Sequence, residues 1–141
     1  MATGIDASII DGLCTKLDEA VIPSMPIAWP NVSFSPDPAA GYLGVSYFPA
    51  AALQQELGDN GRNRFIGVFQ VSVFYPKDRG EVAAREIAAD VANHFKRGTV
   101  ISHDGLSIRI LRPPLAGSGF VDGPFFQVPV SINYQVDADN P

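Results

Sequence analysis

Apolar residues near the start of the chain recur at spacings of three and four, the period of a helix that buries one face. The repeat runs through residues 3–20, and Thr3 with Asp6 is placed as a capping box at its start. Its apolar positions are Ile9, Ile10, Leu13, Cys14 and Leu17. We therefore expect a first amphipathic helix, which Gly12 weakens by up to about 1 kcal/mol relative to alanine.

A second and stronger helical pattern covers residues 81–97. Its apolar positions are Ala84, Ile87, Ala88, Val91 and Phe95. Glu81 lies near the positive end of this predicted helix, and Gly98 stands where a C′ glycine would end it. The pattern predicts a second amphipathic helix.

Elsewhere the hydrophobic pattern is typical of β-strands. Aromatic and β-branched residues fill residues 42–48 and 64–75, and the second stretch is apolar on both faces for part of its length, as in a central strand. Two shorter strands are predicted at residues 99–102 and 106–111, joined by a His-Asp-Gly turn at 103–105.

The last predicted strand, residues 125–136, alternates with a period of two. The inward positions are Phe126, Val128, Val130, Ile132 and Tyr134. Because Pro129 has no N–H, we expect an unpaired edge or a bulge there. Residues 137–141 are expected to fray.

Residues 28–34, AWPNVSF, fit neither period. Trp29 and Phe34 can each bury roughly 150 to 250 Å², so we expect them to fold this connection back onto the sheet. Pro30 stiffens the path, and Asn31 can bond the local backbone.

Residues 50–63 carry a Gly-Asp-Asn-Gly turn signal and no clear period. We expect a long protruding hairpin loop, with a short helical turn at residues 51–57. Such loops cost little entropy to lengthen and often carry function.

Together these elements predict one α+β domain over residues 1–141. Its sheet is expected to be mostly antiparallel, with about four to five strands and both amphipathic helices packed on one face.

Charge argues against a nucleic-acid-binding module. The net charge is -5, and the ten basic residues are scattered along the chain. Affinity for a phosphate backbone comes from clustered Lys and Arg that displace counterions. Tight DNA binding is therefore not expected.

The composition also bears on location. No apolar run approaches the roughly 18 residues that a membrane span needs, and the first residues lack the pattern of a signal peptide. Cys14 is the only cysteine, and a single cysteine suits a reducing compartment. We interpret Cys14 as a small apolar residue of the first helix. We expect assembly in a cytoplasm.

Few residues suggest catalysis or metal binding. His94 and His103 have no metal-site spacing, and the Gly-Ser-Gly-Phe segment at residues 117–120 lacks the pattern of a nucleophile elbow. We expect no catalytic residues, no metal site and no cofactor.

Several short motifs in order resemble the tail terminator proteins of long-tailed bacteriophages. A W-P-N-x-x-F segment supplies Trp29, Pro30, Asn31 and Phe34. An R-x-x-G-x-x-Q-V strand followed by Y-P supplies Gln70, Tyr75 and Pro76. A helix closing on F-x-x-G-T and the final strand FFQVPVSINY complete the set.

The resemblance implies a non-enzymatic virion protein at the head-proximal end of the tail. Such proteins form a ring, usually a homohexamer, that caps the tail tube, ends its polymerisation and joins the head through a head-completion protein. The implied partners are other copies of the chain, the tube protein and the neck protein. DNA passes through the ring, and no membrane is involved.

The loop at residues 50–64 is our candidate for the contact with the tube or with a neighbouring subunit. The residues proposed for it are Gln54, Gln55, Glu56, Asp59, Arg62 and Arg64. Arg62 and Arg64 are expected to supply ion pairs.

Two alternatives stay open at this point. One is a head-completion or stopper protein of the neck, whose size and ring habit overlap with those of terminators. The other is a small enzyme or ligand-binding domain that uses the loop at residues 117–120 together with His103 and Asp104.

Overall fold

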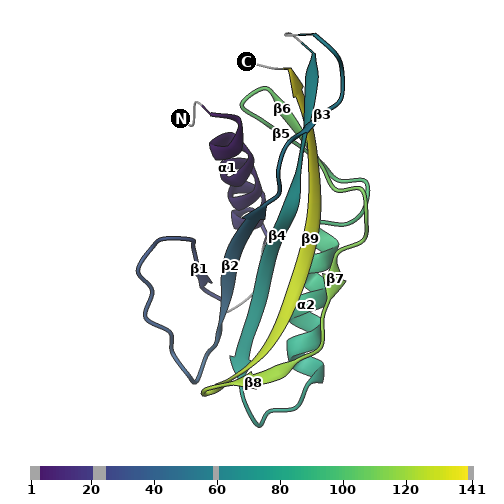
Figure 1. Cartoon of the computed structure of the whole chain (residues 1–141). Helices are drawn as coiled ribbons and strands as arrows, with labels where there is room; N and C mark the ends of the chain where they lie inside the picture. Colours follow the sequence, from purple (N-terminus) through teal and green to yellow (C-terminus); the bar gives the residue numbers. More distant parts are fainter. Residues whose placement is uncertain (1–3, 21–24, 59–60, 140–141) are drawn as a thin grey trace.

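The computed structural model describes residues 4–20, 25–58 and 61–139. The helices are α1 (Ile5–Asp18) and α2 (Val82–His94). The strands are β1 (Ile27–Ala28), β2 (Tyr42–Pro49), β3 (Leu53–Gln54), β4 (Arg62–Pro76), β5 (Val100–His103), β6 (Leu106–Arg109), β7 (Leu115–Ala116), β8 (Phe120–Asp122) and β9 (Phe125–Asp139) (Figure 1). None of the described helices is long and apolar enough to cross a membrane.

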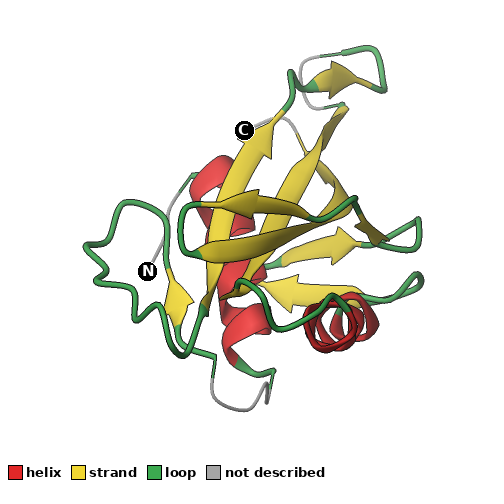
Figure 2. Ribbon diagram, turned by 90° about the horizontal axis from the view of Figure 1, so that it is seen from below, coloured by secondary structure: helices red, strands yellow, loops and turns green. Residues whose placement is uncertain are grey.

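One sheet contains all the described strands. Its main path runs β1-β2-β4-β9-β6-β5, while β3 pairs with β4, and β7 and β8 pair with β9. The pairing of β1 with β2 is parallel, and the other pairings are antiparallel. The α+β class agrees with the prediction, but the sheet is mixed, curled and nine-stranded in the described residues rather than antiparallel with four to five strands (Figure 2).

The centre of the sheet is the pairing of β4 with β9. The two strands are in register along their whole length, from Arg62 opposite Asp139 to Pro76 opposite Phe125. The predicted central position of β4 is confirmed, because β2 pairs along its other side.

An unpaired edge or a bulge was predicted at Pro129: β9 is not an edge strand, because it pairs with β4 on one side and with β7 and β8 on the other, but the ladder on the β7 and β8 side is interrupted at this residue. Pro129 lies opposite Ser72 of β4, and its carbonyl accepts a hydrogen bond from the Gly117 N–H. In a strand the N and C=O of one residue point to the same side, so the proline nitrogen faces the interval between β7 and β8. A missing N–H is tolerated there because no ladder bond is needed.

Both helices pack on the same face of the sheet. Buried side chains of α1 and α2 join one hydrophobic cluster with alternate residues of β4 and β9. The buried β4 and β9 members of this cluster are Phe69, Val71, Val73, Val128, Val130, Ile132, Tyr134, Val136 and Ala138. The inward set predicted for the last strand is thus confirmed for Val128 to Tyr134, whereas Phe126 is only partly buried. We call the opposite side of the sheet the outer face.

Gly12 has a packing role that outweighs its low helix propensity. An added Cβ would lie 2.8 Å from Ile108 Cδ1 and 3.0 Å from His103 Cβ. The glycine therefore lets α1 approach the β5–β6 hairpin closely.

The helix ends differ from the predicted ones. The N-cap of α1 is Gly4, which makes no side-chain capping bond. The proposed capping box includes Thr3, which lies outside the described residues. The second helix ends at His94, and Gly98 lies in the following turn with φ +96° rather than at C′. Its N–H donates to the Ile110 carbonyl, which joins the turn to the sheet.

The expected fraying at residues 137–141 is wrong for its first part. Residues 137–139 belong to β9 and pair with Arg62 to Arg64 of β4. Residues 140–141 lie outside the described residues.

The AWPNVSF segment forms a tight turn. Val32 N–H donates to the Trp29 carbonyl, and Asn31 has φ +57°. Proline followed by a residue with positive φ is typical of a type II turn. Trp29 packs against the core, and the Phe34 ring lies 4.9 Å from the Tyr42 ring, so the segment does return to the sheet.

Candidate assembly surface

A hairpin projects from one end of the sheet, between β2 and β4 (Figure 1). We call residues 50–58 and 61 the arm; residues 59–60 lie outside the described residues. Leu53 pairs with Arg64 and Gln54 with Asn63, so the arm continues the sheet as a narrow ladder. The predicted helical turn at residues 51–57 is wrong, because this pairing holds the chain extended. Residues 50–58 are all exposed.

Hydrogen bonds within the hairpin hold the arm's shape. The N–H groups of Gln55 and Glu56 both donate to the Arg62 carbonyl, and the Arg62 N–H donates to Glu56 Oε1 at 2.8 Å. The Gln54 side-chain amide donates to the Glu56 carbonyl. Much of the polar capacity of this segment is therefore used inside the subunit.

The two arginines proposed for intersubunit ion pairs have partners within the chain. Arg64 Nε donates to Asp137 Oδ1 at 3.0 Å, and Arg62 Nε lies 3.7 Å from Asp139 Oδ1. The Gln55 side-chain nitrogen donates to Asp137 Oδ1 at 2.9 Å, and the Gln55 side-chain oxygen accepts a hydrogen bond from Arg64 Nε. Arg64 thus belongs to an intrachain network. Asp59, also proposed, lies outside the described residues.

Sequence reasoning missed the apolar side chains of this region. Phe48 is 53% exposed, Leu53 51% and Leu57 93%. The sequence did indicate this exposure, because Leu53 and Leu57 lie in a polar, turn-rich segment in which no hydrophobic core is expected to bury them. Exposed apolar residues grouped in one place are typical of interaction sites.

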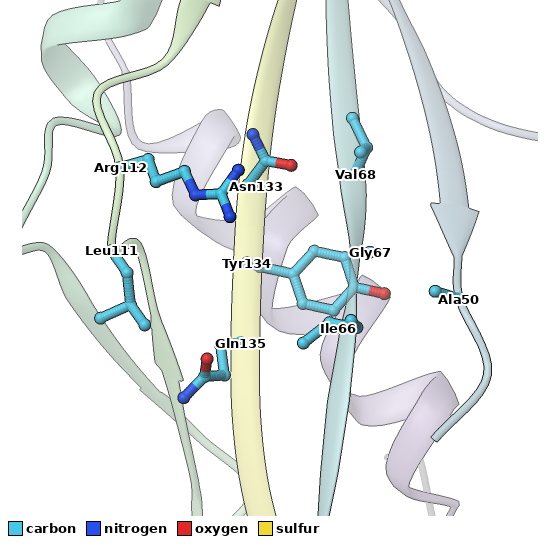
Figure 3. Close-up of a pocket in the computed structure, with 9 residues that line it drawn as sticks. All are labelled: Ala50, Ile66, Gly67, Val68, Leu111, Arg112, Asn133, Tyr134 and Gln135. Carbon is cyan, nitrogen blue, oxygen red and sulfur yellow. The ribbon is translucent and has the colours of Figure 1, made fainter. Parts of the chain in front are cut away.

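A cavity of about 290 Å³ opens on the outer face, near the base of the arm (Figure 3). Its walls come from the residue after β2, from β4, from β9 and from the segment after β6. The lining residues are Ala50, Ile66, Gly67, Val68, Leu111, Arg112, Asn133, Tyr134 and Gln135. No carboxylate, histidine or cysteine is among these described lining residues, so the cavity lacks the groups of an acid-base or nucleophilic site.

The charge beside this cavity is uncompensated. Within the described part of the chain, the Arg112 guanidinium has no hydrogen bond or ion pair, and Figure 3 shows it extending toward Asn133. Arg109 lies opposite Gln135 in the sheet and is also exposed. The cavity therefore combines apolar walls with an available cation and two side-chain amides.

A second exposed apolar region lies at the opposite end of the sheet, where β8 meets β9 (Figure 1). Phe120 and Val121 of β8 are exposed there, and exposed Leu115 of β7 lies further along β9, opposite Ser131. The two ends of the molecule therefore differ: one carries the projecting arm, and the other a short apolar hairpin.

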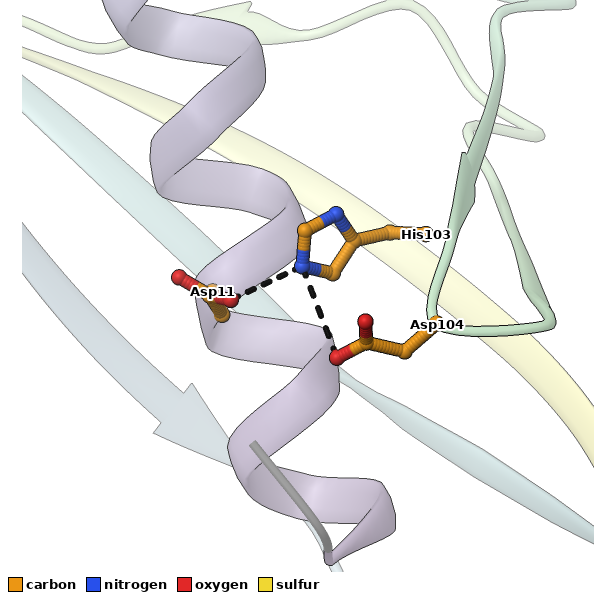
Figure 4. A group of neighbouring side chains, drawn as sticks. All are labelled: Asp11, His103 and Asp104. Carbon is orange, nitrogen blue, oxygen red and sulfur yellow. Dashed lines mark hydrogen bonds and ion pairs between the residues drawn. The ribbon is translucent and has the colours of Figure 1, made fainter. Parts of the chain in front are cut away.

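A polar cluster joins α1 to the β5–β6 turn (Figure 4). His103 Nε2 bonds Asp11 Oδ2 at 2.8 Å and lies 3.6 Å from Asp104 Oδ2, which also accepts from the Ser8 hydroxyl at 3.1 Å. Asp11, His103 and Asp104 are potential metal ligands, and their ligand atoms lie within 4.8 Å of one another. The interactions among these side chains explain why they lie together, and they link α1 to the β5–β6 turn. We call this cluster the latch.

The loop at residues 117–120 also has a structural role. Arg85 Nη1 donates to the Gly117 carbonyl at 2.8 Å, which joins α2 to this loop. The loop runs from β7 into β8, whereas His103 and Asp104 face α1 (Figure 4). The structure thus does not bring together the groups of the enzymatic alternative.

The remaining motif residues lie on β4. The Gln70 amide donates to the Ser72 hydroxyl on the outer face, Tyr75 packs against the core, and buried Pro76 ends the strand. The motif glycine, Gly67, lies opposite Tyr134. An added Cβ would lie within 3 Å of the tyrosine ring.

Comparisons with known proteins give one family. The family model described as "Phage tail terminator protein" matches residues 8–134 of the chain. A solved structure with no descriptive name is 28% identical, with a TM-score of 0.71 over 90% of this chain and 94% of its own. No curated protein matches the chain.

Proposed function

Because the chain belongs to the phage tail terminator family, a family of structural proteins of the virion tail, we propose that it forms a ring at the head-proximal end of the tail tube. The ring ends polymerisation of the tube and provides the surface at which the head is joined. The family match over residues 8–134 carries this proposal.

The shape of the subunit supports a capping role. A cap needs one surface that fits the tube and another that does not, because otherwise addition would continue. The arm end and the β8 end differ in shape and in residues. A homohexamer forms when one surface meets a different surface of the next copy and the rotation closes after six subunits.

The charge supports passage of DNA through the ring without specific binding. With a net charge of -5, the chain offers little of the counterion-release affinity that would retain a phosphate backbone.

Electron microscopy of tubes assembled with and without the purified protein tests the proposal. In this experiment, polymerisation of the tube protein is started without the chain, and the chain is then added while the tubes grow. We expect shorter tubes with a ring at one end only. Tubes of unchanged length, with the protein bound instead to the neck of heads, would favour the stopper alternative.

A further inference from the structure

We propose that Leu57 at the tip of the arm inserts into the outer-face cavity of a neighbouring copy of the chain, with Glu56 facing that copy's Arg112. This inference rests on the proposed ring and names the contact that builds it. The occupant of the cavity is thus a second copy of this chain.

Leu57 has the properties of an anchoring side chain. It is 93% exposed, so its burial in an apolar cavity removes a large apolar side chain from water. The hydrogen bonds from Gln55 and Glu56 to the Arg62 carbonyl hold the strand that leads to it. Because that backbone is already ordered, docking the tip costs little further conformational entropy.

The cavity fits such a side chain in size and character. It measures about 290 Å³ and has apolar walls at Ile66, Val68 and Leu111. Asn133 and Gln135 supply amides at its border. Leu111 is half exposed, so an incoming leucine would cover apolar surface that is open in the single chain.

Charge complementarity favours the arm as the occupant. Arg62 and Arg64, the cations at the arm, are paired with Asp139 and Asp137. The exposed Glu56 carboxylate accepts the Arg62 N–H through Oε1 only, so it keeps its negative charge and a second oxygen beside Leu57, and the tip has acidic character. Arg112, without a partner among the described residues, lies at the cavity that would receive it.

The tip cannot fill the cavity of its own subunit. Ala50, at the base of the arm, lines that cavity, and the ladder of Leu53 with Arg64 carries the arm away from it. From Ile66 to Arg62 the strand advances roughly 13 Å, and Leu57 lies beyond that point. Two different surfaces must then meet, which is the arrangement that produces a ring.

Light scattering on purified variants tests the contact. Leu57→Asp and Arg112→Glu should each reduce the assembled mass to that of a single chain, because one places a charge in an apolar cavity and the other repels Glu56. Matched controls are Val32→Asp and Arg79→Glu, which change exposed residues away from the arm and the cavity. Both controls should assemble as the unchanged chain does, and circular dichroism should show all four variants folded.

Mixing the two assembly-deficient variants gives a sharper result. The Arg112→Glu chain keeps its arm, and the Leu57→Asp chain keeps its cavity, so each pair retains one intact contact. We expect an equimolar mixture to give dimers and no rings. A mixture that remains monomeric would overturn the arm-to-cavity contact.

Failure of this inference is distinguishable from failure of the proposed function. If the unchanged chain forms no ring even on tubes, the proposed function fails. If Leu57→Asp still forms rings, the inference is overturned while the ring stands. Rings of that variant that no longer cap tubes would identify the tube protein as the partner of the arm.

Discussion

Gly67 and Tyr134 form a cross-strand pair in which the tyrosine ring covers the glycine. An alanine Cβ at this position would lie 2.4 Å from the Tyr134 hydroxyl and 2.6 Å from the Phe48 carbonyl oxygen. That hydroxyl donates to Tyr47, which donates to Asp6 of α1, at 3.1 and 2.8 Å. Because Gly67 has no side chain, the Tyr134 ring can lie over it. Hydrogen bonds then link Tyr134 of β9 through Tyr47 of β2 to Asp6 of α1.

Replacing this glycine should destabilise the fold. We expect Gly67→Ala to lower the free energy of unfolding by about 1 to 3 kcal/mol, measured by urea denaturation. The same change in a Tyr134→Ala background should cost less, because the ring is gone. Equal costs in the two backgrounds would show that the ring is not the obstacle.

Cys14 should be a slow nucleophile. Burial, together with the nearby Asp11 carboxylate, raises the pKa of its thiol to about 11. Because the thiolate is the reactive form, alkylation at pH 7 to 8 should be roughly 100-fold slower than for an unshifted thiol. The rate should rise about tenfold per pH unit up to pH 10, measured with iodoacetamide. A plateau near pH 9 would contradict the raised pKa, and the urea-unfolded chain is the control.

Residue roles at the arm were only partly predictable. The turn signal at residues 58–61 predicted a hairpin, and β3 pairs with β4 on either side of it. The partners of Arg62 and Arg64 were not predictable, because Asp137 and Asp139 lie far away in the sequence and meet them only through the register of β4 with β9. Exposure of Leu57 also depends on how far the hairpin extends beyond the core.

The latch between α1 and the β5–β6 turn should contribute modestly to stability. Asp11→Ala removes the 2.8 Å bond to His103, and we expect the free energy of unfolding to fall by up to about 1 kcal/mol, since the groups are partly exposed. Amide hydrogen exchange should increase in α1 more than in α2. Asp18→Ala, on the same helix with no partner among the described residues, is the control. An equal effect of both variants would argue against the latch.

Elements with a strong period were predicted well, and elements set by their neighbours were not. Alternation along the last strand located its buried face from Val128 to Tyr134. The interruption at Pro129 was predicted only as an edge or a bulge, because a sequence does not reveal that β7 and β8 pair with β9 on either side of this residue. The two-residue strands have too few residues to show any period, so the sheet was predicted too small.

At the scale of the whole molecule, the arm should be separable from the fold. It lies outside the hydrophobic cluster, and residues 50–58 are exposed. Deleting residues 55–60 should leave the circular dichroism spectrum and thermal midpoint nearly unchanged but abolish ring formation and tube capping. Tails of normal length with normal head joining from a phage carrying this deletion would contradict an assembly role for the arm.

The long pairing of β4 with β9 also affects how the protein is made. Residues 77–124 separate the two strands, and at about 5 to 20 residues per second a ribosome needs roughly 2 to 10 s to synthesise them. During that interval β4 can pair with β2, but the edge that later receives β9 stays open, with Phe69, Val71 and Val73 not yet covered by a complete core. Until β9 is synthesised, the open edge of β4 can pair with a strand of another nascent chain on a neighbouring ribosome, and faster synthesis of residues 77–139 shortens that exposure.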